Sequence, residues 1–277
     1  PLALFIAIGI FFINGANFTP VFPQDIYVDG SFAQAAVLLF FAYTGFEVIA
    51  IAAEDMKNPK KNLPRAIIMC MLLVSILYMA ILAVSIGVLG TDLANTKAPV
   101  QDAFNVIVGP IGMYIVLVGT LISMGGINFA EAYYAPRVAT SMAEDGMLPS
   151  ALAKRNRYNA PYIAAIVTAI ASVLLAWSGS FTTLAAISAV SRFTQYLPTC
   201  LAVIIFRRKW ADKARSYTIP GGYLIPVIAI GTSLWMLAQA QTNQLLWGLG
   251  GCIVILPFYY SYWKKKKAGL IKDHDEM

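Results

Sequence analysis

Three charged residues, Glu47, Glu131 and Arg192, lie within long apolar stretches of the sequence. A charged side chain at the centre of a lipid bilayer costs about 2.5–3.5 kcal/mol on insertion scales. Such residues therefore face a protein interior or a water-filled cavity, where they carry protons, bind ions or contact a substrate. We take these three residues as the first candidates for a functional site.

Glu47 closes the run Phe41-Ala42-Tyr43-Thr44-Gly45-Phe46-Glu47. Gly45 lies in the middle of this apolar stretch, and glycine lowers helix stability by about 1 kcal/mol relative to alanine. Aromatic neighbours and a nearby carboxyl favour a helix that is discontinuous at about residues 41–47 and opens onto a cavity. The alternative is a continuous helix in which Gly45 permits close packing.

An opened helix turns backbone carbonyl groups toward the cavity, where they would hold an ammonium group. Phe41, Tyr43 and Phe46 would then wall or gate this cavity. A carboxyl group in a medium of low dielectric favours its neutral form, so Glu47 would take up and release a proton near neutral pH. A proton relay is the default hypothesis for such a group.

Glu131 and Arg192 each leave several interpretations open. Glu131 lies about 9 Å of helix before Arg137, and Glu47 lies about 10 Å before Glu54, so we expect the two carboxyls at similar depth. Glu131 is a candidate counter-charge for a cationic substrate; otherwise it pairs with Arg192 or reaches water on the inner side. Arg192 either extends toward the outer surface, pairs with a carboxyl or meets a substrate carboxylate.

Composition indicates that membrane helices carry these residues. Of 277 residues, 59% are hydrophobic and 12% are charged, whereas soluble proteins have about 25% charged residues. A soluble enzyme domain is therefore excluded. The three cysteines form no CxxC pair, and the one histidine, His274, lies in the polar tail. We predict no cofactor and no metal site.

Eight apolar segments can be marked, and seven of them are long enough to span a bilayer with some tilt. They form an all-α polytopic bundle over residues 1–263, followed by a tail at 264–277. The segments are 1–13, which is partial, 31–53, 65–90, 110–135, 161–178, 184–206, 223–241 and 245–263. Because the sequence is apolar from its first residue, we expect it to begin inside a helix of a longer protein.

The number of lysine and arginine residues per loop alternates along the chain. Loops with none or one are followed by loops with four or five. Positively charged loops face the cytoplasm, so the C-terminus is predicted to lie inside, in a multi-pass protein of the cell membrane. The net charge of +6 comes from these loops and indicates topology, with no nucleic acid partner. Within the loop at 136–160, Val138–Glu144 and Pro149–Arg155 are predicted to form short interfacial helices.

Three stretches resemble amino acid permeases of the amino acid–polyamine–organocation (APC) superfamily. Phe41–Glu47 with Glu54–Ile67 resembles helix six and the loop after it, and Pro136–Pro149 resembles the segment after helix eight. Ala98–Phe104 is similar to the outer loop between helices seven and eight. The resemblance implies a LeuT-like fold with a five-plus-five inverted repeat, of which this chain holds the end of helix five through helix twelve. The N-terminal helices of the first repeat would then be missing from this sequence.

The resemblance also implies a substrate site. Carbonyl groups at the positions of Phe41, Ala42 and Thr44 would hold the amino group of the substrate, within a cavity formed by Phe41–Phe46 that includes Tyr43 and Gly45. Phe41 would gate the outer side, and Glu47 would sense or carry a proton. The substrate carboxylate would bind to helix one, which lies outside this sequence.

We therefore predict a secondary transporter that carries amino acids by alternating access. It would be a symporter coupled to H⁺ or Na⁺, or an amino acid exchanger, and it would catalyse no reaction. Three alternatives stay open: an amino acid sensor that does not transport, a polytopic membrane enzyme, and a channel. The enzyme alternative lacks a histidine or an acidic motif at membrane depth.

Overall fold

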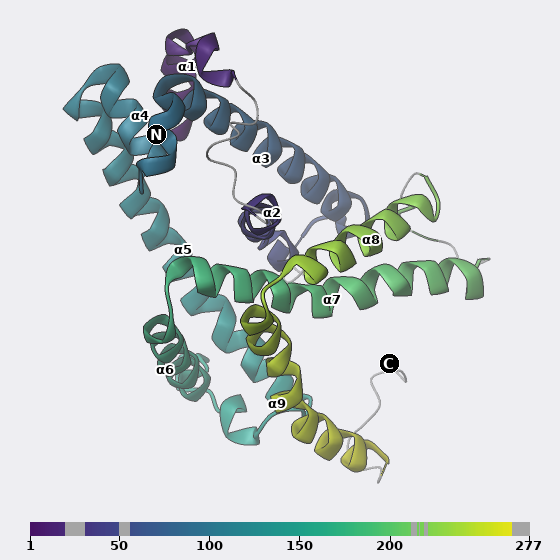
Figure 1. Cartoon of the computed structure of the whole chain (residues 1–277). Helices are drawn as coiled ribbons and strands as arrows, with labels where there is room; N and C mark the ends of the chain where they lie inside the picture. Colours follow the sequence, from purple (N-terminus) through teal and green to yellow (C-terminus); the bar gives the residue numbers. More distant parts are fainter. Residues whose placement is uncertain (20–30, 50–55, 212–214, 216, 219–220, 268–277) are drawn as a thin grey trace. The chain divides into compact units, whose positions relative to one another are not determined.

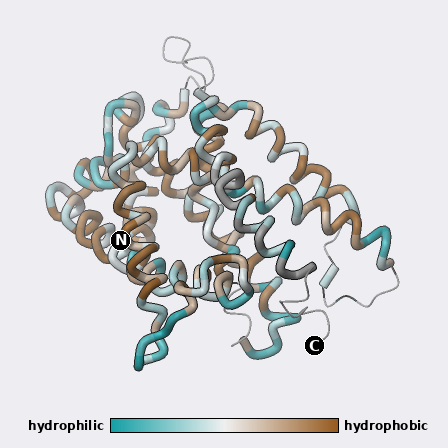
Figure 2. Tube along the Cα trace, turned by 90° about the horizontal axis from the view of Figure 1, so that it is seen from below, coloured by the Kyte–Doolittle hydropathy of each residue, from teal (hydrophilic) through white to brown (hydrophobic). Residues whose placement is uncertain are grey.

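The computed structural model describes residues 1–19, 31–49, 56–211, 215, 217–218 and 221–267. Within this part every regular element is a helix (Figure 1). Apolar residues run along the helices, and hydrophilic residues gather at turns and helix ends (Figure 2). The end of the predicted segment 31–53, the reference residue Glu54 and the tail after residue 267 lie outside the described residues.

The chain divides into two compact units, each described here by itself. Unit 1 comprises Pro1–Ser31, Tyr43–Ile127 and Ala214–Thr218, and unit 2 comprises Phe32–Ala42, Asn128–Lys213 and Ile219–Met277. The chain passes from unit 2 to unit 1 between Ala42 and Tyr43, inside the predicted site.

Unit 1 is built around one long helix, α3. Its elements are α1 (Leu2–Gly9), η1 (Ile10–Phe12), η2 (Gly15–Phe18), α3 (Pro59–Leu89), η4 (Gly90–Asn95), α4 (Pro99–Val108) and the first part of α5 (Pro110–Glu144). Phe5 and Phe104 are fully buried and meet edge to face, with ring centroids 5.6 Å apart. A Cβ atom on Gly9 would lie 2.3 Å from Val84 Cγ1, so this close helix contact requires glycine.

Unit 2 is built around α7. Its elements are α2 (Ser31–Ala42), the second part of α5, η5 (Ser150–Ala153), α6 (Tyr162–Ser178), α7 (Phe181–Lys209), α8 (Leu224–Gln239) and α9 (Thr242–Lys267). α7 contacts α6, α8 and α9. The hydroxyl of Ser191 on α7 donates to the backbone carbonyl of Gly248 on α9 at 3.0 Å, so the two helices lie close together there. Val37 of α2 packs against Ala186 and Ala189 of α7.

Four described helical spans are long and apolar enough to cross a bilayer: Ser31–Ile49, Pro59–Asn95, Pro110–Glu144 and Phe181–Lys209. Leu224–Gln239 and Thr242–Gly250 pass the same test only as a pair, and they are bent by 120°. Leu2–Phe12 and Tyr162–Ser178 are apolar but shorter, whereas a span needs about 20 residues. These helices are those of a polytopic membrane protein.

Several helices continue through proline, which the sequence pattern treats as a boundary. α5 passes Pro136 and ends at Glu144, so Val138–Glu144 is the end of a long helix and no separate element. Likewise α3 contains Pro64, and α7 contains Pro198. In the region predicted as a helix at Pro149–Arg155, the structure has the short 3-10 helix η5.

Candidate functional site

The helix that carries the predicted site is interrupted. α2 ends at Ala42, a turn occupies Tyr43–Gly45, and a 3-10 helix follows at Phe46–Ile49. Gly45 has a φ of +105°, a value that residues with a side chain rarely adopt. A Cβ atom added there would meet no atom within 4 Å, so the backbone conformation rather than crowding requires glycine.

The side chain of Glu47 binds the backbone of this turn. The backbone N–H of Gly45 donates to Glu47 Oε2 at 2.9 Å, and the N–H of Val48 donates to the Gly45 carbonyl at 3.2 Å. A hydrogen bond to a carboxylate is about twice as strong as a bond between neutral groups. The acid and the glycine that the sequence singles out therefore form one local structure.

In unit 1, the turn is flanked by an aromatic pair. The ring of Tyr43 meets the ring of Tyr78 on α3 nearly edge to face, with centroids 5.3 Å apart. Thr44, Phe46 and the Glu47 side chain are half-buried. Tyr78 was absent from the predicted site, because only the tertiary fold brings it to Tyr43.

In unit 2, aromatic side chains of α7 hold the last turn of α2. Phe40 stacks on buried Phe193 at 4.6 Å and meets Tyr196 at 5.9 Å. Phe41 meets Phe181 edge to face at 6.1 Å. Such pairs contribute about 0.5–1.5 kcal/mol each beyond the burial of area. They pack the last turn of α2 against α7.

The structure does not bring Glu131 and Arg192 together. Both belong to unit 2, where Glu131 is exposed on α5 and Arg192 is half-buried on α7. Among the described residues no ion pair joins them. An ion pair elsewhere in unit 2 links Glu144 to Arg155, with Oε1 and Nη2 2.8 Å apart.

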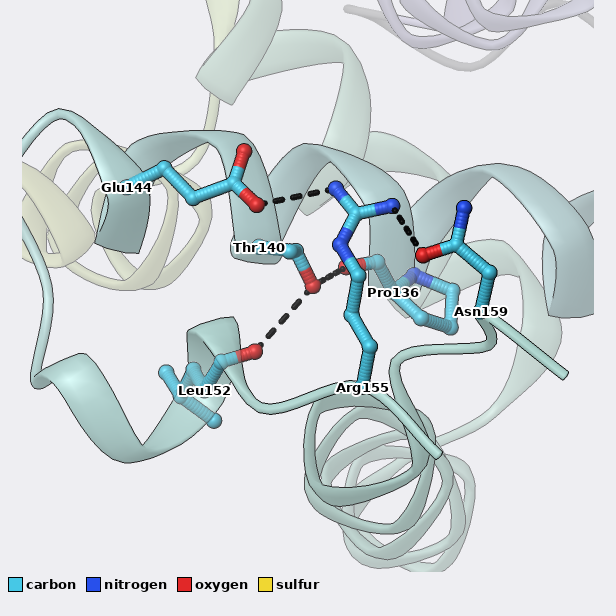
Figure 3. A network of polar contacts seen from close by, with 6 residues as sticks. All are labelled: Pro136, Thr140, Glu144, Leu152, Arg155 and Asn159. Carbon is cyan, nitrogen blue, oxygen red and sulfur yellow. Dashed lines mark hydrogen bonds and ion pairs between the residues drawn. The ribbon is translucent and has the colours of Figure 1, made fainter. Parts of the chain in front are cut away.

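That ion pair belongs to a polar network at the end of α5, shown in Figure 3. Thr140 is 1% exposed, and its hydroxyl lies 2.9 Å from the Pro136 carbonyl and 3.1 Å from the Leu152 carbonyl. Arg155 also donates to the side-chain oxygen of Asn159, at 3.4 Å. The network fastens the chain after α5 to the last turns of that helix. Sequence reasoning did not single it out.

A second contact supports α5 beside its proline. The guanidinium of Arg137 lies 3.4 Å above the centre of the Tyr133 ring and donates to the Tyr133 carbonyl at 3.0 Å. Both contacts hold the Arg137 side chain against the turn of α5 that precedes it.

The described residues include no cluster of three or more His, Cys, Asp or Glu side chains that could hold a metal ion. The chemistry at the interruption is that of a backbone turn, aromatic rings and one carboxylate. Such a set offers hydrogen-bonding groups and aromatic ring faces to a small polar molecule.

The known proteins that are similar to this chain are permeases, transporters and exchangers. A family model described as "Amino acid permease" matches residues 1–258. The chain is 29% identical to the branched-chain amino acid permease BcaP of Bacillus subtilis and 28% identical to the serine/threonine exchanger SteT of the same organism. These alignments cover 95% and 97% of this chain, and 56% and 62% of the relatives. A methylthioribose transporter of Bacillus subtilis is 29% identical over 95% of the chain and 57% of its own length.

Proposed function

The chain belongs to the amino acid permease family of the APC superfamily, and from this premise we propose that it is part of a secondary transporter for amino acids. It spans less than two thirds of the relatives described above, so we assign the remaining helices of a LeuT-like inverted repeat to sequence outside this chain. The transporter would lie in the cell membrane with its C-terminus in the cytoplasm.

The interruption at Tyr43–Gly45 is the observation that carries this proposal. A chain that leaves the α-helical path inside an apolar span turns its backbone groups in directions that a regular helix does not allow, and such groups are suited to hold the charged ends of a substrate. Carbonyl groups near Phe41, Ala42 and Thr44 would hold the ammonium group of the amino acid. Phe41 and Phe46 would border the cavity.

The bond between Gly45 and Glu47 supports a role for Glu47 in coupling. An ionised carboxylate accepts hydrogen bonds with both oxygens, whereas a protonated carboxyl has one oxygen that donates. Protonation of Glu47 would therefore weaken the bond that closes the turn, and binding of a proton and the shape of the substrate site would be linked. Transport would follow by alternating access.

Uptake into proteoliposomes tests the proposal. The full-length protein is reconstituted, an inward proton gradient is imposed, and the uptake of labelled branched-chain, small and basic amino acids is followed. Glu47→Gln keeps the size of the side chain and removes the titrating group. Glu131→Gln is the matched control for the branched-chain and small amino acids, because it removes a carboxyl on α5 that is exposed and outside the interrupted helix.

We expect saturable, gradient-driven uptake by the wild type and the Glu131→Gln variant, and uptake by Glu47→Gln that no longer responds to the gradient. Uptake only into liposomes preloaded with amino acid would identify an exchanger. Unchanged gradient dependence in Glu47→Gln would make that residue structural. Binding without uptake, by folded protein, would replace the transporter with a sensor.

A further inference from the structure

A tight turn at residues 156–160 joins η5 to α6 within unit 2. The backbone N–H of Asn159 donates to the Asn156 carbonyl at 2.9 Å, and the N–H of Asn156 donates to the Ala160 carbonyl at 2.9 Å. The side-chain oxygen of Asn156 accepts the N–H groups of Tyr158 and Ala160, at 2.9 and 3.0 Å. Arg157 and Tyr158 are the central residues of this 156–160 turn, so its bonded backbone holds both of them at the tip.

The tip of the turn combines a cation with an exposed aromatic ring. The guanidinium carbon of Arg157 lies 4.7 Å from the centre of the Tyr158 ring, and Tyr158 is 72% exposed. Lys154, at the end of η5, is exposed as well. The sequence from 146 to 180 contains three basic residues and no acidic one. This stretch therefore carries a positive charge beside an amphipathic ring.

α6 follows the turn directly and is short for a membrane helix. Its 17 residues correspond to about 26 Å, whereas the hydrocarbon core of a bilayer is about 30 Å thick. A helix shorter than the core is accommodated when the bilayer thins around it or when flanking side chains extend to the interface. Either adjustment brings lipid headgroups to the level of the residues that flank α6.

The exposed side of α6 has the pattern of a helix that faces lipid. Large side chains that are 44–83% exposed recur at helical spacing along it: Tyr162, Ile166, Ile170, Val173, Leu174 and Trp177. The two aromatic residues of this series lie about 22 Å apart along the helix, and tyrosine and tryptophan are enriched at the two membrane interfaces. Because basic loops face the cytoplasm, the end with the 156–160 turn is the inner one.

We propose that the 156–160 turn binds the headgroup of an anionic phospholipid of the inner leaflet, whose acyl chains lie along the exposed side of α6. Arg157 donates to the phosphate, because the planar fork of a guanidinium suits two oxygens of one phosphate group. Lys154 adds a second positive charge. A zwitterionic lipid binds less well, because its choline or ethanolamine group brings a positive charge to a positive surface.

The proposed lipid site lies on the segment that the polar network fastens to α5. Arg155 precedes the turn, and its guanidinium binds both Glu144 of α5 and Asn159 of the turn, as Figure 3 shows. A headgroup held between Lys154 and the tip of the turn would order the backbone on both sides of Arg155. Anionic lipid would thereby steady the last turns of α5.

Photo-crosslinking of a lipid probe tests this site. The full-length protein is placed in nanodiscs of phosphatidylcholine that contain a small fraction of phosphatidylglycerol with a diazirine on its acyl chain, close to the glycerol. After illumination and digestion with trypsin, mass spectrometry measures the probe attached to the peptides that contain α6 and end at Arg192, the first basic residue after Arg157. Phosphatidylcholine with the same diazirine gives the reference yield.

We expect the phosphatidylglycerol probe to label these peptides about fivefold to 25-fold more than the reference, a factor of about five for each of Lys154 and Arg157. Arg157→Gln should lower this preference about fivefold. Arg208→Gln is the matched control, because it removes an exposed arginine from the last turn of α7; it should change the preference by less than about twofold.

Asn156→Ala separates the shape of the turn from its charge. This variant keeps every charge and removes the oxygen that accepts two backbone N–H groups. The preference for phosphatidylglycerol should fall about twofold to tenfold, the range for the loss of one hydrogen bond. An unchanged preference would show that the turn is not the site.

Two further results would overturn the proposal. Equal labelling by both probes would show that anionic lipid is not selected, and equal losses in Arg157→Gln and Arg208→Gln would show that the charge of the whole inner face attracts it. Inorganic phosphate lacks acyl chains and should not displace the probe; displacement would replace the lipid with a free anion. The experiment involves no transported solute, so its failure would leave the proposed transport function untouched.

Discussion

Two apolar helices of this protein differ in whether they continue past a residue that disfavours helix. α5 contains Pro136 and nevertheless continues to Glu144, whereas α2 contains no proline and stops at Ala42. Proline costs about 3 kcal/mol in a helix interior relative to alanine, and glycine costs about 1 kcal/mol. Intrinsic propensity therefore gives the wrong order, and the surroundings of each position decide which helix is interrupted.

The two surroundings differ in the chemistry of the side chains that bind the backbone. At Pro136, the hydroxyl of Thr140 and the guanidinium of Arg137 bind backbone carbonyls, and neither group changes its charge near neutral pH. At Gly45, the partner is the carboxyl of Glu47. The proline region is suited to keep one shape, whereas under the proposed role of Glu47 the turn after α2 would change its shape when that carboxylate takes up a proton.

The largest expected effect is a loss of uptake on substitution of Gly45, the residue with a positive φ at the interruption. Gly45→Val places a β-branched residue at a φ of +105°, at a cost of about 1–3 kcal/mol. If this strain falls on the substrate-binding conformation, initial uptake should drop about fivefold to 150-fold. The measurement is the initial rate of uptake per folded transporter in proteoliposomes.

Gly231→Val is the control for that experiment. Gly231 lies in α8, has no positive φ, and a Cβ atom there would also meet nothing within 4 Å. Uptake by this variant should change by less than about twofold, because only the helix propensity differs. Equal losses in the two variants would mean that volume, and not backbone conformation, is what matters at Gly45.

A smaller effect is expected at the proline of α5. Thr140→Val keeps the shape of the side chain and removes the hydroxyl that binds the Pro136 and Leu152 carbonyls. Loss of the partner of a buried polar group costs about 1–3 kcal/mol. The chain after α5 should open more often, so trypsin should cut after Lys154, Arg155 and Arg157 about fivefold to 150-fold faster.

Cleavage is followed by mass spectrometry in inside-out vesicles. Ser141→Ala is the matched control, because Ser141 is the next residue along α5 and its side chain is exposed. If Thr140→Val leaves the cleavage rate at the level of Ser141→Ala, the hydroxyl does not hold the loop.

The smallest effect is expected for the ion pair in the same network. The side chains of Arg155 and Glu144 are 41% and 47% exposed, and pairs at the surface contribute about 0.2–1 kcal/mol. Glu144→Gln should therefore raise the rate of trypsin cleavage by no more than about fivefold. The increase should shrink further as salt is added, because salt screens exposed charges. An effect as large as that of Thr140→Val would place the ion pair, rather than the hydroxyl, at the centre of the network.

The sequence indicates an interrupted helix at the right place because its signals are local, and the structure decides against the continuous helix that the same residues allow. Gly45 disfavours helix, and an acid two residues later can reach back to the backbone of the same turn. The all-helical membrane architecture also followed from composition, since no other pattern accounts for so many apolar runs. The permease family was recognised from the stretches that begin at Phe41 and at Pro136.

What the sequence could not give depends on contacts between distant residues. α5 continues through Pro136, whereas a rule for proline alone predicts a boundary there. Tyr78 and Phe181 come to the interrupted helix through tertiary packing, and an aromatic residue in an apolar run carries no sign of its partner. For the same reason Glu131 and Arg192 were left with several interpretations. The roles of the predicted site residues stay predictions.

The length of α5 has a mechanical consequence. Its 35 residues correspond to a rod about 52 Å long, whereas the hydrocarbon core of a bilayer is about 30 Å thick. A turn of this rod by about 10° around its midpoint would carry its end through about 4.5 Å. Since Thr140 and Glu144 fasten the following chain to that end, Leu152 and Arg155 would travel with it. α5 is thus a lever arm that converts a slight tilt of the helix into a displacement, at the end that bears Glu144, wide enough to admit a water molecule.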